Sequence, residues 1–195
     1  MEANIKLLSK DTPYGDNLDY IYTELPAALS HVHKLSITSA LCIFDEVLQG
    51  FAKTSARFIN LRHLTMYLPL SGDLESIGGI LRLAYLLELA PTLEELELHA
   101  NGGDVDVGWA LRRNMLPYPH NKLKRVLISG ASQWEGLMEL AYYILQSANR
   151  LDCMILDPMI RIGGPPLDGW MVDIGREMIK KLFEGEEFRS ILTIL

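Results

Sequence analysis

A short apolar pattern recurs along the chain at nearly even intervals. In each copy one apolar residue is followed three positions later by a second, and two positions after that by a third. The starts of the five copies lie 29, 32, 30 and 28 residues apart, which is a spacing typical of solenoids. The five copies are Val32, Leu35 and Ile37; Leu61, Leu64 and Met66; Leu93, Leu96 and Leu98; Leu123, Val126 and Ile128; and Leu151, Met154 and Leu156.

Each copy predicts one short parallel strand. The last two apolar residues of a copy lie two positions apart, so both side chains point to the same face of the strand. A parallel neighbour requires a crossover connection, and the period leaves room for a helix in each connection. We therefore expect an α/β fold, a leucine-rich repeat solenoid of about six or seven units. Its strands line the concave side, its helices lie on the convex side, and residues 1–195 form one domain.

Helical periodicity marks the connecting segments. Ser132 and Glu135 form a capping box before the best of the apolar stripes, and Pro91 ends another of the helices. Ile5 and Leu7 indicate a first strand, while the unit at residues 100–117 has the weakest pattern. The expected helices span residues 42–56, 73–90, 132–148 and 173–183, and a closing strand is expected within residues 188–195.

The residues that alternate with the apolar positions should form the exposed concave face of the sheet. In the early strands they are polar, whereas the later strands add apolar side chains, so we expect the partner's anchor toward the C-terminal repeats. The expected partner-binding residues are Lys34, Ser36, His63, Thr65, Glu95, Glu97, Arg125, Leu127, Cys153 and Ile155.

Composition narrows the class of partner. The net charge is -7 and no run of Lys and Arg exceeds two residues, so binding to nucleic acid is not expected. The apolar runs are too short or too interrupted by charge to span a membrane. The two cysteines, Cys42 and Cys153, do not form a disulfide framework, which favours a cytoplasmic or nuclear protein.

A second interpretation is a small enzyme or metal-binding protein built on the repeats. His63, Glu97 and His99, with Glu95 nearby, could ligate zinc, because side chains two apart on a strand share a face. Asp104 and Asp106 are candidate acids beside a glycine-rich turn. The sequence lacks the common hydrolase, phosphate-binding and EF-hand motifs, so we expect neither enzymatic activity nor a metal or other cofactor.

Four segments carry a resemblance to a known family. Residues 119–130, PHNKLKRVLISG, lead into a helix, and residues 154–158, MILDP, end the next strand. These segments resemble the FBD region of plant F-box/LRR proteins, which makes residues 117–195 an FBD-like C-terminal part. Residues 60–66 and 90–99 resemble the leucine-rich repeats of that family.

The resemblance implies a substrate-recognition part of a ubiquitin-ligase adaptor. Its partner would be a protein substrate. No segment resembles the F-box, so binding to Skp1 is not expected of this chain. The first expected strand has an uncovered edge, and an uncovered edge invites pairing. We therefore expect self-association through residues 1–10.

Overall fold

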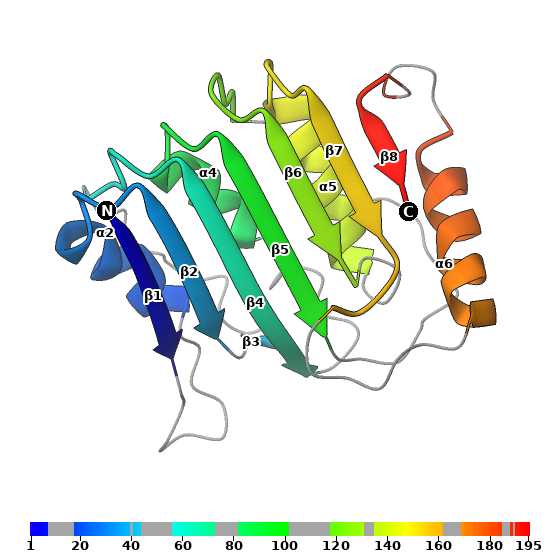
Figure 1. Cartoon of the computed structure of the whole chain (residues 1–195), viewed down its shortest axis with the longest axis horizontal. Coiled ribbons are helices and arrows are strands. Elements are labelled where there is room, and N and C mark those ends of the chain that lie inside the picture. The colour runs from blue at the N-terminus through cyan, green and yellow to red at the C-terminus, as the bar shows by residue number, and fades with distance from the viewer. Residues whose placement is uncertain are drawn as a thin grey trace.

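Seven parallel strands form one continuous sheet in the described part of the chain (Figure 1). The computed structural model describes residues 1–7, 18–39, 41–43, 56–72, 82–101, 118–130, 135–161, 169–184, 188 and 190–195. The strands, in spatial order, are β1 (Glu2–Leu7), β2 (Lys34–Ser39), β4 (His63–Gly72), β5 (Glu95–Asn101), β6 (Arg125–Ser129), β7 (Cys153–Asp157) and β8 (Leu192–Ile194). The open α/β solenoid expected from the repeat spacing is confirmed.

The five apolar copies lie in register across the sheet. Leu35 pairs with Leu64, Leu64 with Leu96, and the same row continues through Val126 and Met154. The second apolar row runs two residues further along each strand. Side chains of both rows in β2, β4, β5, β6 and β7 are at most 4% exposed. Apolar burial on one face of these five strands therefore holds the repeats together, because neighbouring units share one continuous core.

The helices lie on the buried side of the sheet. They are α1 (Leu18–Thr23), α2 (Leu25–Ala28), the 3₁₀ turn η2 (Arg82–Ala84), α4 (Tyr85–Leu89), α5 (Glu135–Ser147) and α6 (Gly169–Leu182). In Figure 1, α4 and α5 pass behind the strands, and α6 lies beside β8 at the C-terminal end. The opposite face of the sheet carries none of the described helices.

Three of the expected elements need correction. The helix expected to begin at Cys42 is wrong at its start, because β3 (Leu41–Ile43) is a strand that pairs in parallel with the end of β4. The helix expected from Asp173 begins at Gly169. The closing strand is only the three residues of β8.

Other expectations fall partly outside the described residues. These include most of the helix expected at residues 42–56, the start of the helix expected at residues 73–90, the Ser132 side of the capping box, and residues 102–117. Where the chain is described, α4 does end just before Pro91, and α5 fills the predicted span from Glu135 onward.

One buried histidine joins two repeats behind the sheet. Nε2 of His120 donates to the carbonyl oxygen of Ala90 at 3.0 Å, and Nδ1 accepts from the backbone N–H of Leu123 at 3.1 Å. The side chain is 2% exposed. Burial lowers the pKa of His120, with the bond to Ala90 acting in the opposite direction. The neutral ring thus satisfies one backbone group in each of two successive turns.

Candidate interaction surface

Three rows of side chains cover the face of the sheet opposite the helices, which we call the open face. Strand alternation places them there, because their neighbours along each strand form the core. The first row is Glu2, Lys34, His63, Glu95, Arg125 and Cys153; the second is Asn4, Ser36, Thr65, Glu97, Leu127, Ile155 and Thr193; the third is Lys6, Thr38, Tyr67, His99, Ser129 and Asp157. All ten residues predicted to share this face lie in its first two rows.

The first row consists mainly of acidic and basic side chains. Nδ1 of His63 donates to Oε2 of Glu95 at 2.7 Å, and the guanidinium of Arg125 contacts the other oxygen of the same carboxylate. At the far end, Nζ of Lys34 lies 3.6 Å from Oε1 of Glu2. These side chains are one-quarter to two-thirds exposed. Exposed pairs of this kind add little stability, but they fix the direction in which each charged group points.

A second group of charged side chains lies one residue earlier, where the chain enters each strand. Glu94 receives a hydrogen bond from Nζ of Lys124 at 2.7 Å, and Arg62 lies 3.8 Å from its other oxygen. The bond from Lys124, aided by the charges of Lys124 and Arg62, lowers the pKa of Glu94 despite an opposing desolvation effect. Glu94 therefore lies between two cations at the entry to the strands, which favours its ionised form.

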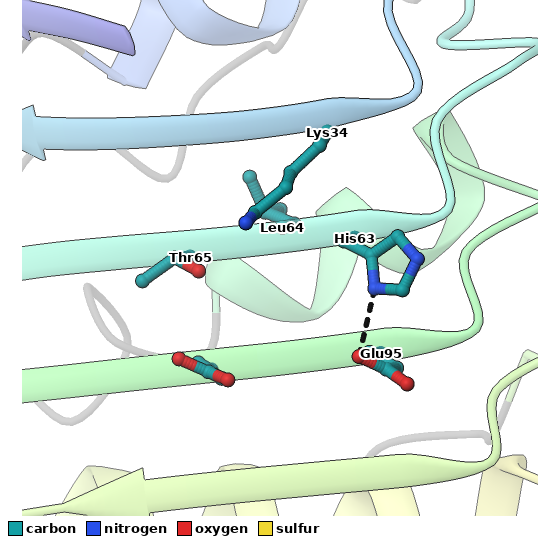
Figure 2. Close-up of a pocket in the computed structure, with 6 residues that line it drawn as sticks. Lys34, His63, Leu64, Thr65 and Glu95 are labelled. Atoms are coloured by element: carbon teal, nitrogen blue, oxygen red, sulfur yellow. Dashed lines mark hydrogen bonds and ion pairs between the residues drawn. The ribbon is translucent and has the colours of Figure 1, made fainter. Parts of the chain in front are cut away.

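A hollow of about 340 Å³ opens on this face above β4 and β5. Figure 2 shows the hydrogen bond between His63 and Glu95 at one end of the hollow, with Lys34 and Thr65 among the other side chains that line it. The residues that line it are Lys34, His63, Leu64, Thr65, Glu95 and Glu97. Five of these six are polar or charged, so the hollow suits a polar or charged group of a partner rather than a purely apolar one.

The second row changes character along the sheet. Ser36 and Thr65 are polar, Glu97 is an acid whose side chain is 47% exposed, and Leu127 and Ile155 beyond it are apolar and half-buried. Glu97 pairs directly with Leu127, which pairs with Ile155. A carboxylate at the edge of the hollow thus borders an apolar strip on the two following strands.

The sequence argument placed His99 on this face but missed the other members of the third row. His99 is 9% exposed, stacks on Tyr67 with a 5.0 Å distance between ring centres, and lies 2.8 Å from Oγ of Ser129 through Nδ1. Asp157 is 2% exposed and accepts a 2.6 Å bond from Nε of Arg161. The signal was present in the sequence, since each residue lies two positions after a member of the second row. His99, Ser129 and Asp157 are buried and form the floor of the face at β5 to β7, whereas Lys6 on β1 is exposed.

The grouping expected for the metal or enzyme interpretation does not form. Oε2 of Glu97 lies 3.6 Å from Nε2 of His99, but His63 is separate from this pair, in the first row against Glu95. No cluster of three metal-binding side chains occurs among the residues that the structure describes. Asp104 and Asp106 lie outside those residues.

The fold and its open face define a leucine-rich repeat domain. A scan against protein-family models matches residues 2–165 to the family described as "At1g61320/AtMIF1, LRR domain". The chain belongs to this family, and the match supports a plant leucine-rich repeat protein. Searches of curated proteins and of solved structures found no match.

Membership of this family indicates a role in protein interaction. Leucine-rich repeat domains are typically non-enzymatic and use an extended sheet face for protein interaction. None of the described helices has the length and apolar character needed to cross a membrane.

Proposed function

We propose that this protein is a recognition module whose open face binds a protein segment with a basic side chain next to an apolar one. The observation that carries the proposal is the position of Glu97. Its carboxylate is half-exposed at the edge of the hollow and pairs across the sheet with Leu127. The basic side chain enters the hollow toward Glu97, and its apolar neighbour packs on Leu127 and Ile155.

Charge on the face supports a cation in this position. The Arg125 guanidinium contacts Glu95, and the ammonium of Lys34 lies near Glu2. Glu97 lies 3.6 Å from Nε2 of His99, a group that carries charge only when protonated. A Lys or Arg from a partner would therefore meet a carboxylate that the fixed cations of the first row do not neutralise, and a partly desolvated pair of this kind favours specificity.

Strand geometry sets the spacing of the two anchors. Adjacent strands lie about 4.8 Å apart, so the Leu127 and Ile155 side chains lie about one and two strand spacings from Glu97. A bound segment that crosses the strands places its basic and apolar side chains about 5–10 Å apart. Neighbouring or next-but-one residues of an extended peptide meet this requirement.

The finer assignment is the substrate-recognition part of a plant F-box/LRR ubiquitin-ligase adaptor. Residues 119–130 and 154–158 support it through their resemblance to the FBD region. In this assignment the chain binds the substrate. Recruitment of Skp1 requires an F-box, and no segment of this sequence resembles one. A cytoplasmic or nuclear location fits that role and the small number of cysteines.

Selection of peptides on the purified chain tests the proposal. A displayed random peptide library is panned on the wild-type chain, and the selected peptides are titrated into wild type, Glu97→Lys and Leu127→Asp. We expect selected peptides to carry Lys or Arg beside an aliphatic or aromatic residue, and each variant to weaken binding at least tenfold. The proposed surface would be overturned if the selected peptides lacked a basic residue, or if both variants bound the peptides as tightly as wild type does.

The adaptor assignment needs a separate arm. Purified Skp1 is added to the immobilised chain, and a fusion that carries an F-box from a known adaptor serves as the positive control. We expect Skp1 to bind the fusion and not the chain. Direct capture of Skp1 by the chain alone would contradict this expectation.

A further inference from the structure

Strand β1 lies at one end of the sheet, and the described residues pair with only one of its two edges. The backbone N–H of Lys34 donates to the carbonyl oxygen of Met1 at 3.3 Å. Because successive residues of a strand turn their backbone groups to opposite sides, Met1, Ala3 and Ile5 face β2. The backbone groups of Glu2, Asn4 and Lys6 therefore point to the outer edge.

The same three residues carry self-complementary side chains. Glu2, Asn4 and Lys6 are exposed on the open face, with an acid at one end, a base at the other and a neutral amide between them. When two copies of this edge meet around a two-fold axis, the strands run antiparallel. If Asn4 faces Asn4 of the second copy, each Glu2 lies opposite a Lys6.

The backbone alternation supports this register. In an antiparallel ladder, residues that exchange both backbone hydrogen bonds lie directly opposite each other. In this register they are Glu2 with Lys6, and Asn4 with its own copy, which are the residues whose backbone groups point outward. Opposite charges that lie directly across an antiparallel pair stabilise it, whereas a register in which like charges face each other destabilises it.

The core side of β1 has room for a neighbour. Ala3 and Ile5 are half-buried, whereas Leu35 and Ile37, their partners on β2, are fully buried. The proposed register places Ile5 beside Ala3 of the second copy on that same side. Pairing would thus cover apolar surface that β2 leaves partly exposed.

We infer that β1 is a homodimerisation edge, which pairs antiparallel with β1 of a second copy and is centred on Asn4. The two sheets then form one continuous sheet, with both open faces on the same side. This interface is separate from the partner-binding surface at Glu97 and Leu127, so the proposed recognition function and the dimer can fail independently.

Charge reversal at the edge provides the test. Sedimentation equilibrium over a concentration series measures the mass of wild type, Lys6→Glu, Glu2→Lys and the double swap Glu2→Lys/Lys6→Glu. We expect wild type to approach about twice the 22.0 kDa chain mass, both single variants to remain near the monomer mass, and the double swap to restore the dimer. Lys122→Glu makes the same charge change as Lys6→Glu at an exposed turn and should dimerise like wild type.

Amide exchange gives a second readout of the register. On raising the protein concentration, the amides of Glu2, Asn4 and Lys6 should exchange more slowly, whereas those of Ala3 and Ile5 should change little. A monomer at all concentrations would overturn the inference. A dimer whose stability is the same in wild type and in all three charge variants would overturn it too. Slow exchange of the outward amides in a monomer would also overturn it, since another segment would then occupy the edge.

Discussion

Nδ1 of His63 and Oε2 of Glu95 lie 2.7 Å apart on adjacent strands, at paired positions of the register. The same carboxylate is contacted from the other side by Arg125. Three successive repeats therefore hold one acid in place at the end of the hollow (Figure 2). The network is partly exposed, so its effect lies in the orientation of charge more than in the stability of the fold.

Glu95→Gln should leave the fold nearly as stable as wild type. We expect the free energy of unfolding to fall by less than about 1 kcal/mol, because exposed ion pairs contribute little. Urea denaturation followed by circular dichroism measures the change. A loss of more than about 2 kcal/mol would show that the network is a structural element, contrary to this account.

Leu96→Asp should destabilise the domain by more than about 3 kcal/mol, because it places an unpaired carboxylate in the shared core. Leu96 is 4% exposed, between Leu64 and Val126. Glu97→Gln, one residue along on the open face, is the matched control and should unfold like wild type. Similar melting temperatures for the two variants would mean that the two faces of β5 are assigned the wrong way round.

Gly130→Ala should cost about 2 kcal/mol or more in unfolding free energy. Gly130 has φ of 74°, and a Cβ there would collide with the carbonyl oxygen of Ala100. Gly169→Ala is the control, since Gly169 lies at the start of α6 with open space around its Cα. Thermal unfolding of both variants checks the prediction, which fails if the two substitutions have equal effects.

Acidification should destabilise the domain through His120. Burial lowers the pKa of this imidazole in the folded state, so the unfolded state binds the proton more tightly. The stabilising contribution of neutral His120 is complete above the unfolded pKa of about 6.5 and is lost as the pH falls toward the lower folded value. Unfolding free energies of wild type and His120→Gln, measured from pH 7.5 to 5, should converge on acidification. Parallel curves would contradict the role assigned to His120.

The repeat pattern predicted the sheet well, because each copy combines strand periodicity with burial. Leu96 and Leu98 had to share a face, and the register of every later strand followed from that alternation. The same logic placed Glu97 and Leu127 on the open face. Their role in binding stays a prediction, since a shared face establishes proximity and not recognition.

The connecting segments were harder to predict. Ile21, Tyr22 and Leu25 have helical spacing and are buried in α1 and α2, yet no helix was expected there. At Cys42 the apolar run fits both helical and strand periodicity. Residues 41–43 form a strand because β3 pairs with the long strand β4. Tertiary pairing of this kind overrides local pattern in short apolar runs.

The most direct test compares the proteins captured by wild type with those captured by an open-face variant, Arg125→Glu/Leu127→Ser/Ile155→Ser. The control, Lys122→Glu/Ile59→Ser/Ile174→Ser, makes matched changes at exposed positions away from that face. Each of the three proteins is immobilised on a resin and incubated with plant lysate. The captured proteins are then quantified by mass spectrometry. The account predicts that a set of proteins binds wild type and control, and that the open-face variant loses this set while its circular dichroism spectrum is unchanged. Equal capture by all three proteins would contradict binding through the open face.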